Sequence, residues 1–92
     1  MTTWNFITNY GSVLTLVAKY PQITARQMAS QIGVTERTVL RIIADLEEEG
    51  YLRRSRNGRG NYYEVDWDLP IRGSEMQDIP VGELLNVLLD WD

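Results

Sequence analysis

Residues 25–44, ARQMASQIGVTERTVLRIIA, constrain the fold more than any other stretch of the chain. Ala29 and Gly33 stand four residues apart in it. Around them lie five apolar residues: Met28, Ile32, Val34, Val39 and Ile42. Two short helices that cross at a tight turn need a small residue at the crossing, a glycine for the left-handed backbone of the turn, and an apolar contact. This spacing therefore predicts a helix-turn-helix.

The ends of these two helices are also predicted by the sequence. Thr24 has Gln27 three residues after it, which is the spacing of a capping box, and Thr35 is the expected N-cap of the second helix. Gly50 stands at the C′ position expected after a helix that covers about residues 35–49.

A helix is predicted on each side of this motif. Residues 1–20 carry a broad apolar stripe that stops at Pro21, and they predict one helix before the helix-turn-helix. Another helix is expected at about residues 80–90. Its apolar residues recur at helical spacing: Val81, Leu84, Leu85 and Leu88.

Two strands are expected between the helix-turn-helix and the last helix. Residues 51–56 and 61–66 predict a hairpin joined by the glycine-rich turn 57–60, and residues 22–24 are a candidate third strand. The predicted fold is mainly α with a small β-hairpin (α+β). It is a winged helix-turn-helix, with a three-helix core, a two- or three-stranded wing and a C-terminal helix.

The composition excludes several classes of function. The chain has no cysteine and no histidine, so it lacks a disulfide, the usual zinc ligands and the Ser-His or Cys-His pairs of nucleophilic catalysis. We expect no metal site, no cofactor and no enzymatic activity. No apolar run approaches the roughly 20 residues that span a bilayer, and no basic residue precedes Lys19. We therefore expect a cytoplasmic protein with no membrane partner.

The net charge of −4 is distributed unevenly along the chain. Residues 1–63 hold eight basic and five acidic residues, a net charge of +3, whereas residues 64–92 hold one basic and eight acidic residues, a net charge of −7. We expect residues 1–66 to form a DNA-binding domain, because local charge governs contact with phosphates. Residues 67–92 would form an acidic C-terminal extension whose helix packs on the first helix or lies at a dimer interface.

The second helix of the motif carries the candidate base-reading residues. They lie near its start or on its exposed face: Thr35, Glu36, Arg37, Thr38 and Arg41. Arginine pairs bidentately with guanine, glutamate accepts from the cytosine amino group, and Thr38 at a helix N-terminus suits phosphate. An alternative for Glu36 is a first-turn acid favoured by the helix dipole, and for Arg41 an ion pair with Asp45.

The hairpin is rich in arginine near its tip. It holds Arg53, Arg54, Arg56 and Arg59. A positive tip can reach the DNA backbone or an A·T-rich minor groove, although charged residues also protect an edge strand from pairing with other chains. Tyr63 is expected in the core because alternation places it on one face of the strand with Val65, rather than as a platform for base stacking.

Residues 23–65, ITARQMASQIGVTERTVLRIIADLEEEGYLRRSRNGRGNYYEV, resemble short prokaryotic winged helix-turn-helix transcriptional regulators, loosely related to the MarR type. Residues 68–88 are similar to a subgroup in which a Leu-Pro-hydrophobic-Arg stretch and a Val-Gly-x-Leu-Leu helix follow the wing. The resemblance implies sequence-specific binding of double-stranded DNA and control of transcription. It also implies reading positions at Thr35, Glu36, Arg37, Thr38 and Arg41, and wing contacts from Arg56, Asn57 and Arg59.

We further expect a homodimer, because two-fold pairing presents two recognition helices about one turn of DNA apart. Residues 1–18 and the apolar face of residues 80–91 are the candidate interfaces. Binding over a promoter would then repress transcription. The alternative is a winged-helix protein-protein interaction module without DNA binding. A small-molecule effector is not expected, since aromatic residues such as Trp67 are more often core or interface anchors than ligand contacts.

Overall fold

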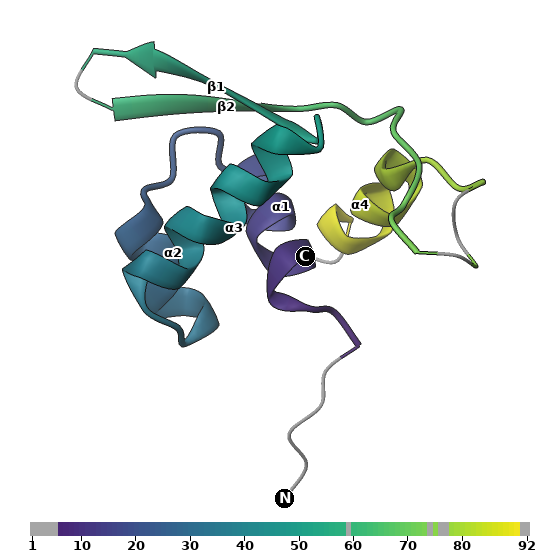
Figure 1. The fold of residues 1–92 in the computed structure, drawn as a ribbon, viewed down its shortest axis with the longest axis horizontal. Coiled ribbons are helices and arrows are strands. Elements are labelled where there is room, and N and C mark those ends of the chain that lie inside the picture. Colours follow the sequence, from purple (N-terminus) through teal and green to yellow (C-terminus); the bar gives the residue numbers. More distant parts are fainter. Residues whose placement is uncertain (1–5, 59, 74, 76–77, 91–92) are drawn as a thin grey trace, which may run out of the picture.

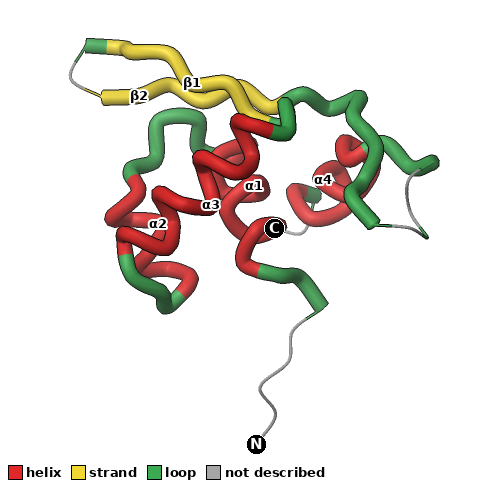
Figure 2. The backbone as a smooth tube through the Cα atoms, in the orientation of Figure 1, coloured by secondary structure: helices red, strands yellow, loops and turns green. Residues whose placement is uncertain are grey.

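The computed structural model describes residues 6–58, 60–73, 75 and 78–90 (Figure 1). Their elements follow in the order α1 (Asn9–Lys19), α2 (Ala25–Ile32), α3 (Glu36–Glu48), β1 (Leu52–Asn57), β2 (Gly60–Val65) and α4 (Val81–Leu89). Helices α1 to α3 pack together, β1 and β2 form an antiparallel hairpin along one edge of this bundle, and α4 lies at another edge (Figure 2). The predicted α+β winged-helix fold is confirmed.

Helix α1 is shorter than the sequence predicts. Residues 6–8 lie outside the helix, and the Thr8 hydroxyl accepts a hydrogen bond from the Gly11 backbone nitrogen at 3.4 Å. Thr8 itself has extended backbone, so the chain enters the helix only at Asn9. The prediction of helix over residues 1–20 is therefore wrong for residues 6–8, and its first five residues lie outside the described part of the chain.

The turn between α2 and α3 forms as predicted. Gly33 has φ 88°, and its backbone nitrogen and that of Val34 donate to the Ala29 carbonyl at 2.9 and 3.1 Å. This left-handed ending satisfies the carbonyl groups that the end of α2 leaves unpaired. At the start of α2, Thr24 and Gln27 form the full capping box. The helix-turn-helix is thus fixed by local backbone chemistry as well as by packing.

The core draws side chains from every element of the fold. Tyr63 of β2 is only 4% exposed, which confirms it as a core residue. The buried cluster consists of Val13, Leu14, Val17, Ile23, Met28, Ala29, Val39, Ile42, Ile43, Leu46, Leu52, Tyr63, Val81 and Leu85. Because one face of α3 is buried in this cluster, its orientation relative to the hairpin is fixed.

The wing has two strands in the described residues, not three. Leu52 pairs with Val65 at its base and Asn57 pairs with Gly60 at its far end. The candidate third strand is reduced to one hydrogen bond, from the Tyr63 nitrogen to the Pro21 carbonyl at 2.8 Å. Residues 22–24 cannot pair further because Ile23 donates its backbone N–H to the Tyr20 carbonyl within a turn and Thr24 caps α2.

Backbone hydrogen bonds join the start of α4 to the chain that follows β2, and Val81 and Leu85 pack into the core. Val81 and Gly82 at the start of α4 donate to the carbonyls of Leu69 and Trp67, at 2.7 and 2.9 Å. Helix α4 then contacts α1 of the same chain. The division of the chain into two domains at residue 66 stays a prediction. None of the helices in the described ranges is long and apolar enough to cross a bilayer.

Candidate nucleic-acid interface

Helix α3 has one buried face and one face open to solvent. Val39, Ile42 and Ile43 are buried on the first, as the helical period of the sequence predicts. The solvent face of its first turns is exposed at four positions: Glu36, Arg37, Leu40 and Arg41. This is the only part of α3 where basic side chains are exposed, so it is the candidate for contact with DNA.

The first turn of α3 is fixed by two threonines. The Thr35 hydroxyl accepts from the Thr38 backbone nitrogen at 3.1 Å, and the two hydroxyl oxygens lie 2.9 Å apart. This confirms Thr35 as the N-cap. The bond between the hydroxyls uses one of their two protons, so the other hydroxyl and the helix's unpaired backbone N–H groups are the donors left for a phosphate at this end.

Arg37 and Arg41 are one helical turn apart on the exposed face. Within the described residues Arg41 forms no ion pair with Asp45, so this alternative is not realised. Asp45 instead accepts a hydrogen bond from the Tyr10 hydroxyl of α1. That bond, followed by burial and by the carboxylate charge, raises the pKa of Tyr10 above its ordinary value. Asp45 is thus held by α1, and the Arg41 guanidinium remains available.

Charge divides α3 along its length. The first two turns carry Arg37 and Arg41, whereas the end of the helix carries four carboxylates, on Asp45, Glu47, Glu48 and Glu49. Such a run of negative charge repels phosphate groups. Contact with DNA is therefore expected only from the N-terminal part of α3, as far as about Ala44.

The hairpin alternates its arginines between two faces. Arg54 stands opposite Tyr63 and points toward α3, where its guanidinium forms an ion pair of 3.4 Å with Glu47. Arg56 is exposed and stands opposite Asn61 on the same face, while Arg53 lies on the other face opposite Glu64. The hairpin and α3 also contact each other through β1.

The side chains of two predicted wing residues, Asn57 and Arg59, are outside the described part of the structure. Arg59 lies outside the described residues, and Asn57 is described only by its backbone, which pairs with Gly60. The structure therefore places five predicted residues on α3 or at its N-cap and two, Arg54 and Arg56, on the hairpin. The sequence did not identify Glu47, the ion-pair partner of Arg54. No sequence spacing could have paired Glu47 with Arg54, because the turn between α3 and β1 sets their distance.

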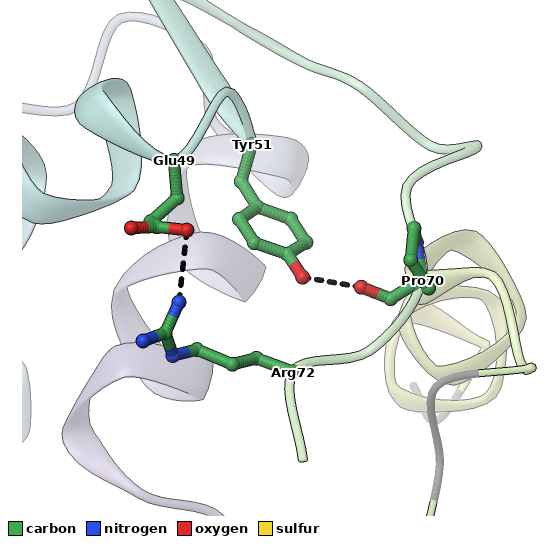
Figure 3. Close-up of polar contacts among 4 residues, drawn as sticks. All are labelled: Glu49, Tyr51, Pro70 and Arg72. Atoms are coloured by element: carbon green, nitrogen blue, oxygen red, sulfur yellow. Dashed lines mark hydrogen bonds and ion pairs between the residues drawn. The ribbon is translucent and has the colours of Figure 1, made fainter. Parts of the chain in front are cut away.

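The sequence also did not predict a groove on another side of the core. It has a volume of about 710 Å³ and lies between α1, the end of α3 and the chain before α4. Figure 3 shows two contacts at its edge: Arg72 forms an ion pair of 2.8 Å with Glu49, and the Tyr51 hydroxyl donates to the Pro70 carbonyl. Most of its lining is apolar, with Leu14, Leu46 and Ile71 among the residues.

Comparison with known proteins identifies a relative by sequence and a solved structure with a similar fold. The chain is 40% identical to riboflavin kinase of Thermococcus kodakarensis over 58 residues. This alignment covers 63% of this chain and 26% of the kinase. The chain thus spans about a quarter of the length of this relative. The solved structure of the PcaV transcriptional regulator from Streptomyces coelicolor, in complex with its natural ligand, is similar with a TM-score of 0.52.

The PcaV similarity covers 88% of this chain and 58% of the PcaV chain at 18% sequence identity, and at that identity it shows the fold alone. The family comparison goes further. The model of the MarR family matches residues 9–59, which is more than half of the chain and runs from the start of α1 into the hairpin. The match contains the whole helix-turn-helix and the exposed face of α3. The protein therefore belongs to the MarR family.

Proposed function

We propose that this MarR-family protein is a sequence-specific regulator that binds double-stranded DNA, with α3 as the recognition helix in the major groove. The observation that carries the proposal is the exposed face of α3, where Arg37 and Arg41 lie one turn apart and, among the described residues, form no ion pair with Asp45. Guanidinium groups so placed can pair bidentately with the O6 and N7 atoms of guanine. Thr35, Glu36 and Thr38 would complete the contact surface at the start of the helix.

The hairpin would add contacts outside the major groove. Arg56 is exposed on the face that Arg54 shares, and Asn57 and Arg59 follow toward the turn. Arginines on such a hairpin can contact the phosphate backbone or enter an A·T-rich minor groove. Arg54 would contribute less than Arg56, because part of its charge is already neutralised by Glu47.

The protein would act as a homodimer that represses transcription. One α3 helix has about two turns ahead of its acidic end and so contacts few base pairs, whereas two copies would read half-sites about one helical turn apart. Phe6, which precedes α1, and Val87 of α4 are among the most exposed apolar side chains of the described residues. They support pairing through residues 1–18 or through the apolar face of α4. A dimer on a promoter in the cytoplasm would block polymerase.

A second candidate function is a protein-interaction module without DNA binding. The apolar groove beside α1 favours it, because grooves of this kind accept apolar side chains of a partner. Its acidic surroundings, with Asp45, Glu48 and Glu49 in the lining, would suit a basic partner segment.

One titration separates the two candidates. Fragments bound by the protein would be selected from random duplex DNA, and their affinity measured by fluorescence anisotropy at about 50 and 200 mM salt. We expect one preferred sequence, with affinity that falls steeply with salt. Absence of binding at the lower salt concentration would overturn DNA recognition and leave the interaction module.

A further inference from the structure

We infer that Leu40 determines specificity by contacting the 5-methyl group of a thymine in the bound DNA, an inference that rests on the proposed function. Leu40 is 47% exposed, although leucine on an amphipathic helix is usually placed on the buried face. The buried face of α3 is already filled by Val39, Ile42, Ile43 and Leu46. Leu40 therefore has no role in the core cluster.

The position of Leu40 matters more than its exposure, since single exposed leucines are common on protein surfaces. Leu40 lies one turn after Glu36 and directly precedes Arg41, at the centre of the exposed face. One turn further on, Ala44 is also exposed, and its side chain is a single methyl group. Leu40 and Ala44 thus form a short apolar row that runs next to the row of Arg37 and Arg41.

The edges of base pairs in the major groove are polar with one exception. Each base pair presents hydrogen-bond donors and acceptors there, and only thymine adds an apolar group, its C5-methyl. An apolar side chain between two arginines that enter this groove has a matching partner only at a thymine. The carboxylates that follow Ala44 limit contact to the same two turns, so Leu40 lies in the middle of the part that can approach the bases.

The experiment removes single methyl groups from the DNA. The sequence preferred by the wild-type protein is first selected from random duplex DNA, and each thymine is then replaced in turn by deoxyuridine. At the thymine that Leu40 contacts, replacement by deoxyuridine removes one methyl group, and we expect it to lower the affinity of the wild-type protein about fourfold. The Leu40→Ala variant should bind the thymine and deoxyuridine duplexes at that position equally well, and should bind the thymine duplex about as weakly as the wild type binds deoxyuridine.

Ile79→Ala is the matched control. Ile79 is an exposed aliphatic residue before α4 and outside the proposed dimer surface, so its truncation removes apolar surface away from α3. This variant should retain the full wild-type ratio between thymine and deoxyuridine. Tight sequence-specific binding with no methyl effect, or with an effect that survives in Leu40→Ala, would overturn the role of Leu40 and leave the proposed function intact. Absence of any DNA binding would overturn both.

Discussion

Arg54 of β1 and Glu47 of α3 form an ion pair of 3.4 Å that joins the hairpin to the acidic end of the helix. Their side chains are 41% and 27% exposed, so the pair is screened by solvent and contributes at most about 1 kcal/mol to folding. Its larger effect concerns charge. It neutralises one of the arginines that the hairpin would otherwise present to DNA.

Replacement of Glu47 should therefore strengthen DNA binding. In Glu47→Gln the Arg54 guanidinium is released, and we expect affinity for duplex DNA to rise about two- to fivefold, with a salt slope steeper by about 1. The matched control is Glu48→Gln, which removes the same charge from the neighbouring position without releasing an arginine. Anisotropy titrations at several salt concentrations measure both. An equal gain in the two variants would show that general repulsion, rather than the ion pair, limits binding.

Arg37 is expected to carry sequence recognition. Arg37→Ala should weaken binding to the selected sequence about ten- to a hundredfold, because a bidentate contact with guanine is lost. The free energy of unfolding should change little, since Arg37 is exposed. Arg72→Ala, which removes an equal charge from the chain before α4, is the control and should have a much smaller effect on binding. Equal affinity of Arg37→Ala and the wild type would contradict the proposed position of α3.

The hairpin arginines should act through phosphate rather than through bases. Arg56→Ala and Arg59→Ala are each expected to lower the slope of log affinity against log salt by about 1. They should weaken binding to preferred and unrelated duplexes to a similar extent. The Arg53→Ala variant serves for comparison, because Arg53 lies on the opposite face of β1, beside Glu64. Unchanged slopes for both Arg56 and Arg59 would count against contact of the wing with DNA.

The hydrogen bond between Tyr10 and Asp45 should be visible in a pH titration. The bond to the carboxylate raises the pKa of Tyr10 above 10.0 in the folded protein. Its stabilisation is therefore complete below about pH 10 and is lost as the pH rises through the higher folded pKa. Asp45→Asn should lower the pKa of Tyr10 toward the ordinary value. Carbon NMR of labelled tyrosine would follow this, with Tyr10→Phe to assign the resonance, and an unchanged pKa in Asp45→Asn would exclude the bond in solution.

Gly82 should be intolerant of a side chain. A Cβ atom at this position would lie 2.8 Å from the Trp67 carbonyl oxygen and 3.0 Å from the Trp67 Cβ atom. The backbone of Trp67 would have to move, so we expect Gly82→Ala to lower the free energy of unfolding by about 1–3 kcal/mol, despite the better helix propensity of alanine. Urea denaturation measures this. Asn86→Ala, at an exposed position of the same helix, should change stability by less than about 0.5 kcal/mol.

The features of the fold that depend on near neighbours could be predicted from the sequence. Thr24, Gly33 and Thr35 each act within a few residues, so they predict from the sequence alone where α2 begins, where it ends and where α3 begins. The start of α1 was missed because Ile7 continues its apolar pattern, whereas Thr8 caps the helix and sets its start at Asn9. The partners of Arg54, Asp45 and Tyr51 were missed because tertiary packing, and not spacing, brings those groups together.

The two threonines that close the first turn of α3 have a consequence for the thermodynamics of recognition. Thr35 and Thr38 hold this turn in its helical form before any ligand arrives. Docking it would then require little loss of backbone freedom, unlike a segment that orders only on its target. A preformed recognition helix discriminates between sequences mainly through its dissociation rate, so the protein would reside longer on its preferred sequence than on unrelated DNA.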